Sequence, residues 1–386
     1  MKIEIIGKFY DNHSLSIINR NLAIGLYTKH DIVITPLDAV NPDAGVKKEH
    51  LEILDELSSK EVKLGEEAEL QVRHSYPPIW RWPISDKTKV VFIQPWEWMK
   101  IPFEWQYKWE QFADGLIVPS KWLGDHILTA GLNPKKLHII PNGYDSTIFN
   151  HESVQKPSFM PKDKFVFTYV GCAQWRKGLD ILLNAWQKVF KKADKVALVI
   201  KDTPQIYGSN NVLNEITKIQ YSTGCAEIVY LDDNYSAEDM AAIFKHSNAV
   251  VHPYRAEGFG MHVQEAMACG CIPIVSEFGP TDEFVGDVAL KLDMVRKSIN
   301  INSGEVFALK PGDATTMMST YATAFEPTVD SVYRLLNKLY YSHTKEEFTE
   351  KVKNFKLENT WENVILKYES ALKTILDNEG TQRGTE

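Results

Sequence analysis

The chain has 386 residues, of which 44% are apolar and 24% charged, and its formal net charge is -8 at pH 7. This length exceeds the size at which one hydrophobic core keeps growing, so two domains are expected. The composition is that of an ordinary soluble globular protein. The negative charge argues against a nucleic-acid partner, because phosphate backbones are bound by clustered Lys and Arg.

The cysteines and the N-terminal segment indicate the cellular compartment in which the protein is expected. Four cysteines show no C-x-x-C spacing and are expected to be reduced and mostly buried: Cys172, Cys225, Cys269 and Cys271. The segment Met1–Gly7 has too short an apolar run for a signal peptide. No apolar run approaches the ~18 residues of a membrane-spanning helix. We therefore expect a cytoplasmic location and leave a peripheral contact with a membrane surface open.

Short apolar runs of strand type alternate with helical stretches along the chain. The expected strands are Ile3–Ile6, Asp31–Thr35, Val90–Ile93, Leu116–Val118, Phe165–Val170, Val196–Ile200, Ile228–Tyr230, Ala249–His252 and Ile272–Val275. The expected helices include Ser14–Lys29, Leu179–Phe190, Ala237–Phe244 and Met261–Ala268. This alternation predicts an α/β protein with parallel sheets covered by helices on both faces. The charge-rich segment Asp38–Arg73 is expected to be a peripheral helix or a mobile excursion.

A domain boundary is expected near the turn signal Pro141–Asp145. The stretch Asn150–Lys164 has two prolines and mixed charge and is typical of a linker. A new strand–turn–helix unit begins at Phe165, so we predict two Rossmann-like domains, residues 1–148 and 149–361.

The segment from Val250 to Val285 carries the most chemical information. A strand ends at His252, a loop holds Glu257-Gly258-Phe259-Gly260, and a helix is expected from Met261. The two glycines allow backbone amides to approach a ligand, and a helix N-terminus suits a diphosphate. Glu257 and Glu265 can both face one cleft. The simpler interpretation is a polar loop before an amphipathic helix, with Glu257 as a cap and Glu265 on a solvated face.

A second loop, between Tyr169 and Asp180, carries two adjacent cations, Arg176 and Lys177, before a helix. Cations are mildly unfavourable beside a helix N-terminus, so their presence there indicates an anion between them. A diphosphate leaving group would need such cations where no metal neutralises its developing charge.

The order strand, loop, helix and strand, closing on Gly270–Val275, resembles the signature of glycosyltransferase family 4, the glycosyl transferases group 1. Leu116–Trp122 and Ile139–Asp145 resemble two further segments of these enzymes. The resemblance implies the GT-B fold: an acceptor-side domain facing a nucleotide-sugar-binding domain across a deep cleft. It also implies that an amphipathic C-terminal helix, about residues 362–380, packs back on the first domain.

The resemblance implies roles for residues of the second domain. Glu265 would accept hydrogen bonds from ribose hydroxyls, and Glu257 would contact the donor sugar. The glycine-rich loop and the helix start would hold sugar and phosphate oxygens through Gly258, Phe259, Gly260 and Met261. Lys177 matches a family lysine, whereas Cys172 and Ala173 stand where the family has an Arg, so Arg176 is the expected substitute. Loops at strand ends that build a base pocket in this fold carry Lys201, Tyr230 and Leu231, although loop polarity alone explains them equally well.

The first domain offers candidates for the acceptor side or the cleft. Asn12-His13-Ser14 stands where family members often have paired glycines. Ser14 could instead be a helix N-cap, and His13 would then point into the cleft. His74 and Glu97 lie at or near strand ends, where many relatives have a His. Either Glu97 replaces that His, or the role is absent.

The implied activity is metal-independent, retaining transfer of a hexosyl unit, in polysaccharide biosynthesis. The donor would be a nucleotide sugar, by family frequency a UDP-sugar, and the acceptor a saccharide or glycolipid. No cofactor is expected. Two alternatives remain: a sugar-nucleotide epimerase of the same fold, and a non-catalytic GT-B partner subunit.

Overall fold

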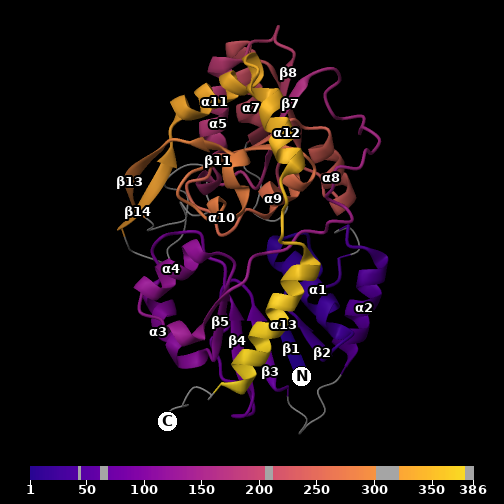
Figure 1. Ribbon diagram of the computed structural model, residues 1–386, viewed down its shortest axis with the longest axis vertical. Coiled ribbons are helices and arrows are strands. Elements are labelled where there is room, and N and C mark those ends of the chain that lie inside the picture. Colours follow the sequence, from indigo (N-terminus) through magenta and orange to yellow (C-terminus); the bar gives the residue numbers. More distant parts are fainter. Residues whose placement is uncertain (42–44, 61–67, 205–211, 301–320, 379–386) are drawn as a thin grey trace. The chain divides into compact units, whose positions relative to one another are not determined.

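The computed structural model describes the chain except residues 42–44, 61–67, 205–211, 301–320 and 379–386. It divides into two compact units. Unit 1 comprises Met1–Glu97, Ile101–Tyr144 and Glu358–Glu386, and unit 2 comprises Trp98–Lys100 and Asp145–Leu357. Figure 1 shows both units with their element labels.

Unit 1 contains a six-stranded parallel sheet in the order β2-β1-β3-β4-β5-β6. Its strands are β1 (Lys2–Gly7), β2 (Asp31–Pro36), β3 (Leu70–His74), β4 (Lys89–Ile93), β5 (Gly115–Val118) and β6 (Leu137–Ile139). Its helices are α1 (Ser14–Tyr27), α2 (Lys48–Ser59), α3 (Phe103–Phe112), α4 (Lys121–Thr129) and α13 (Trp361–Asp377). Each connection between parallel strands requires a crossover, and α1, α3 and α4 lie in such connections.

The interpretation of Asp38–Arg73 as a peripheral segment is correct for α2 and wrong for its end. β3 lies between β1 and β4 and is buried throughout. Two polar side chains, Gln71 and Arg73, interrupt the apolar pattern of this strand, and both are hydrogen-bonded. Gln71 donates to Glu4 Oε2 at 2.7 Å, and Arg73 Nε donates to Gln71 Oε1 at 2.8 Å. A buried strand therefore tolerates these groups because their hydrogen bonds are satisfied.

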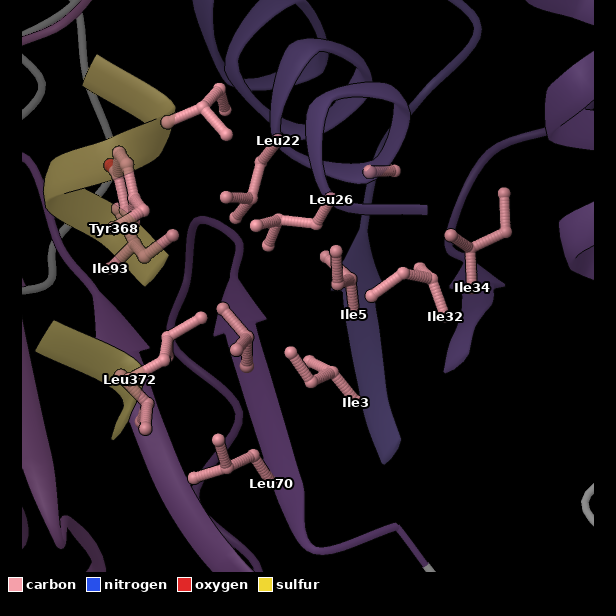
Figure 2. Close-up of a cluster of buried hydrophobic side chains, with 14 of the residues drawn as sticks. Ile3, Ile5, Leu22, Leu26, Ile32, Ile34, Leu70, Ile93, Tyr368 and Leu372 are labelled. Atoms are coloured by element: carbon pink, nitrogen blue, oxygen red, sulfur yellow. The ribbon is translucent and has the colours of Figure 1, made fainter. Parts of the chain in front are cut away.

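The C-terminal helix completes the core of unit 1. In Figure 2, Tyr368 and Leu372 from α13 point into the same cluster as Ile5, Leu22 and Leu70. Tyr368 and Leu372 are at most 1% exposed, and each apolar side chain of this size contributes roughly 1.5–3 kcal/mol through burial. α13 therefore packs against strands that lie far away in the sequence, among them β1 and β3.

Unit 2 repeats the architecture, with a parallel sheet in the order β12-β11-β10-β7-β8-β9. The strands are β7 (Phe165–Val170), β8 (Val196–Lys201), β9 (Glu227–Leu231), β10 (Ala249–His252), β11 (Ile272–Ser276) and β12 (Leu290–Leu292). The helices are α5 (Leu179–Val189), α7 (Val212–Thr223), α8 (Ala237–Lys245), α9 (Met261–Ala268), α10 (Asp282–Val285), α11 (Val329–Tyr341) and α12 (Thr344–Asn354). Two antiparallel strands, β13 (Met294–Asn300) and β14 (Tyr321–Pro327), form a separate ribbon.

The nine expected strands and the four expected helices are present, with ends that differ by at most two residues. Five strands of the structure were not predicted from the sequence, namely β3, β6, β12, β13 and β14. All four cysteines are buried free thiols, as expected. Within the described part of the chain, no helix has the length and apolar content needed to cross a membrane.

Candidate active site in unit 2

The candidate residues of unit 2 gather where its strands end. β7, β8, β9 and β10 are parallel neighbours, so their carboxyl ends lie along one edge of the sheet. β8 ends with Lys201, and the loops after β7 and β10 contain Arg176 and Lys177, and Glu257. In open α/β sheets, this edge is where ligands bind.

The glycine-rich loop leads directly into α9. Gly260 has a φ of +94°, a left-handed conformation, and a Cβ there would lie 2.9 Å from Thr281 Cγ2. Glycine is therefore required on both conformational and steric grounds. The first amides of α9 have no acceptor within the helix, so the loop ends on a group of donors that suits an anion.

Glu257 is held by three donors. Its Oε2 accepts from Lys177 Nζ at 2.5 Å and lies 2.7 Å from His252 Nε2, and its Oε1 accepts from Gly258 N at 2.9 Å. Burial alone would raise the pKa of Glu257, but Lys177, His252 and Arg176 together hold it well below its usual range. Glu257 is thus a buried carboxylate anion. Glu257 does not cap α9. The N-cap residue is Gly260, and this helix has no side-chain capping hydrogen bond.

The cation-bearing loop is locked against the glycine-rich loop. A short 3-10 helix, Trp175–Lys177, carries Arg176, whose backbone oxygen accepts from Arg255 N at 2.7 Å and Ala256 N at 3.2 Å. Gly178 follows with φ +72°, and a Cβ there would lie 1.9 Å from Pro253 O. Arg176 is buried, and its guanidinium approaches Ala256 O at 3.4 Å.

Arg255 stabilises this junction, and the sequence analysis missed it. Its guanidinium donates to both carboxylate oxygens of Asp180 at 2.8 and 2.7 Å, to Trp175 O at 2.6 Å and to Glu326 at 2.6 Å. It also stacks 4.3 Å from the Trp175 ring centroid. Arg255 lies inside the motif between His252 and Glu257, and its position there was the only sequence signal. The bidentate fork suits Arg and would be lost with Lys.

Glu265 lies in the second turn of α9 and is half-buried. Burial raises its pKa to about 7. No hydrogen bond to its carboxylate is found among the described residues. A half-buried carboxylate with a raised pKa differs from one on a fully solvated face, and the ribose contact of Glu265 stays a prediction.

Two residues around the α9 start offer a ligand only their backbone. The Phe259 ring is buried and packs 5.0 Å from the Phe284 ring, and Met261 is also buried. The expected contacts of a ligand with these two amides stay a prediction.

The loops after β7 and β8 and the end of β9 meet at Asp202. Its carboxylate accepts from Ala173 N at 3.0 Å, Thr203 N at 2.7 Å and the Tyr230 hydroxyl at 2.8 Å. Lys201 donates to the Asp202 carbonyl, and burial lowers its pKa to about 8. The Leu231 side chain packs in a core cluster with Met160 and Ile243, so the predicted contact of Leu231 with a donor can involve only its backbone.

The candidates of unit 1 form a separate group. His13, not Ser14, is the N-cap of α1: its Nδ1 accepts from Leu15 N at 3.2 Å, and Ser14 is exposed. The alternative in which Ser14 caps the helix is therefore wrong, because α1 begins at Ser14, one residue earlier than a Ser14 cap would require. His74 ends β3, is fully buried and lies 2.8 Å from Asn19 Oδ1.

The charge state of this group differs from that of unit 2. Burial, with a smaller contribution from nearby His13, lowers the pKa of His74 to about 3, so its ring is neutral. Glu97 is half-buried and adjoins Tyr76, whose pKa is raised by burial and by this carboxylate. The structure thus brings His13 and His74 together, and places Glu97 beside Tyr76.

The fold and this site define a class of proteins. Solved structures with the same architecture include Anabaena HepE in complex with UDP and glucose, at a TM-score of 0.66 and 13% identity over 97% of this chain and 100% of that one. A glycosyltransferase from Rickettsia africae aligns with a TM-score of 0.63 and 14% identity over 98% and 100%. At such identities the likeness shows the fold alone, which is the GT-B fold.

Residues 150–291 match the family model of glycosyl transferases group 1, the family that the motifs resemble. A D-inositol 3-phosphate glycosyltransferase of Catenulispora acidiphila is 28% identical over 42% of this chain and 41% of its own. A GDP-mannose:cellobiosyl-diphosphopolyprenol alpha-mannosyltransferase of Xanthomonas oryzae is 27% identical over 46% and 44%. The chain thus spans about two fifths of the length of these curated relatives.

Proposed function

We propose that the protein transfers a hexosyl unit, with retention and without a metal ion, from a UDP-sugar to a saccharide or glycolipid acceptor. The observation that carries this proposal is the buried ion pair of Lys177 and Glu257, 2.5 Å apart beside the start of α9. It joins a cation suited to a phosphate and an anion suited to sugar hydroxyls at one edge of the sheet. The family match over residues 150–291 supports the same reading.

The proposed chemistry follows from the charges at this edge. The acceptor hydroxyl attacks the anomeric carbon on the face from which the diphosphate leaves, and the bond between that carbon and the phosphate oxygen breaks. Negative charge grows on the diphosphate, where Arg176, Lys177 and the first amides of α9 stabilise it. The departing phosphate oxygen takes the proton of the acceptor hydroxyl, so no strong base is required.

The remaining residues bind the donor. Glu257 accepts hydrogen bonds from the sugar, Glu265 from the ribose, and Lys201 and Tyr230, at the ends of β8 and β9, line the base. His13 and His74 contribute to the acceptor side. Charge-assisted hydrogen bonds of this kind are about twice as strong as neutral ones, which favours carboxylates over amides at these positions.

The test is release of UDP from a panel of UDP-hexoses, with and without EDTA, and determination of the anomeric configuration of the product. We expect slow UDP release without acceptor, faster release with it, an unchanged configuration and no effect of EDTA. Interconversion of the sugar nucleotide without UDP release would identify an epimerase instead. Loss of activity in EDTA that Mn²⁺ restores would refute the metal-independent mechanism, and nucleotide binding with no turnover would identify a non-catalytic subunit.

A further inference from the structure

The proposed mechanism leaves one buried histidine of the site without a role. His252 is the last residue of β10 and has no exposed surface. Its Nε2 lies 2.7 Å from Glu257 Oε2, the same oxygen that accepts from Lys177. Neither the strand pattern nor the motif resemblance assigned a function to this side chain.

The protonation state of His252 follows from its surroundings. Burial lowers its pKa to about 4, against the opposing influence of Glu257. A neutral ring next to a carboxylate must carry its proton on Nε2 in order to donate. Nδ1 is then unprotonated, and it is buried with no hydrogen-bond partner among the described atoms.

The charges facing His252 come from several elements. Lys177 and Arg176 lie in the loop after β7 and lower its pKa, whereas Glu257 in its own loop raises it. From α9, the His262 ring stands perpendicular to His252, with the ring centroids 4.2 Å apart. Burial, with smaller contributions from His252 and Lys177, holds the pKa of His262 well below its usual value. A proton on either ring would meet these cations, so both histidines stay neutral.

Lys177 and His252 both bond to Glu257 Oε2, and a bound diphosphate would compete with this oxygen for Lys177. If Lys177 turns toward a diphosphate, Glu257 Oε2 loses its nearest cation while the carboxylate remains buried. An unpaired buried carboxylate is costly and would rotate or take up a proton. His252 ends β10, whereas Lys177 lies in the loop after β7. A movement of Lys177 therefore leaves the hydrogen bond from His252 to Glu257 in place.

We propose that His252 is a positioning residue, whose Nε2–H holds the Glu257 carboxylate in place so that Lys177 can engage the donor diphosphate. This inference rests on the proposed function for the donor and adds a residue to the site. His252 contacts Glu257 and not the reacting atoms. Its effect should appear in binding of the sugar portion and in turnover, and not in binding of the nucleotide alone.

Three variants separate this role from packing. His252→Leu removes the donor, and His252→Gln keeps an N–H donor at similar reach. His262→Leu is the matched control, since it alters the neighbouring, half-buried histidine, for which no hydrogen bond to Glu257 is found among the described residues. We expect His252→Leu to lower kcat about 10- to 100-fold, the effect of losing one hydrogen bond to a charged group. UDP affinity measured by calorimetry should stay the same, and His252→Gln should recover most of the turnover.

Equal losses in His252→Leu and His262→Leu, or no recovery with Gln, would mean that packing explains the effect and would overturn the inference. A readout independent of activity is the ¹⁵N spectrum of the His252 ring in the ligand-free wild-type protein. We expect a neutral ring with its proton on Nε2 between about pH 6 and pH 8, and a proton on Nδ1 would overturn the inference. A wild-type protein that binds no UDP would instead overturn the proposed function, and the spectrum would still decide whether the hydrogen bond exists.

Discussion

The carboxyl edges of the two sheets each hold a buried polar pair, and the two pairs differ in charge. In unit 2, Glu257 and Lys177 are buried as charged groups, and each stabilises the charge of the other. In unit 1, His74 and Asn19 are buried as neutral groups that pair with each other. The same architecture therefore holds a charged pair at one edge and a neutral pair at the other. This difference teaches that topology sets the location of a site and that side-chain charge sets its chemistry.

The largest expected effect concerns the core of unit 1. Unit 1 needs the C-terminal helix to complete its core, so Leu372→Ala should lower its free energy of unfolding by about 2–5 kcal/mol. Chemical denaturation measures this loss. Leu366 lies on the same helix and is 52% exposed, so Leu366→Ala should cost far less. Similar losses in both variants would contradict the packing of α13.

The next prediction concerns the cations of unit 2. Lys177→Ala and Arg176→Ala should each lower kcat about 10²-fold or more, the scale for losing a preorganised donor to the developing charge. Steady-state kinetics with a UDP-sugar provides the measurement, and the exposed Lys188→Ala is the control. A raised donor KM with normal kcat would show that these cations act only in the ground state. The unit 2 edge would then be a binding site without a charge-stabilising function.

The two glutamates should separate nucleotide binding from transfer. Glu265→Ala should weaken UDP binding by about 1.5–3 kcal/mol, because the ribose loses hydrogen bonds to a charged group. Glu257→Ala should leave UDP affinity nearly unchanged and reduce transfer. Calorimetry with UDP compares the variants, and equal losses in both would contradict the division of roles.

The smallest effect is a pH dependence of donor binding. The pKa of Glu265 is raised to about 7 by burial, and hydrogen bonds from ribose hydroxyls favour its ionised form. Affinity should therefore be highest above pH 7 and should decline toward a tenfold loss per pH unit below it. A UDP-sugar is the suitable probe, because its diphosphate has no further ionisation near neutrality. Glu265→Gln should show a flat profile over this range, and a slope that survives in this variant would assign the titration to another group.

Much of the fold could be predicted from the sequence because its elements are locally encoded. Short apolar runs such as Val196–Ile200 are typical of buried parallel strands, and α9 begins at the predicted residue because Gly260 precedes it. β3 could not be found in this way, since Gln71 and Arg73 break the apolar pattern. Their pairing with Glu4 and with each other depends on a neighbouring strand that is far away in the sequence.

The sequence by itself determined the order of strands and helices, the glycine-rich loop and the identity of the charged residues in it. Tertiary structure alone decided which charges meet. Lys177 and Glu257 are eighty residues apart, and only the adjacency of β7 and β10 brings their loops together. It also decided the ionisation of the site, because burial raises the pKa of Glu265 and lowers that of His252. Burial and pairing arise when distant segments pack, and a local pattern of residues does not contain that information.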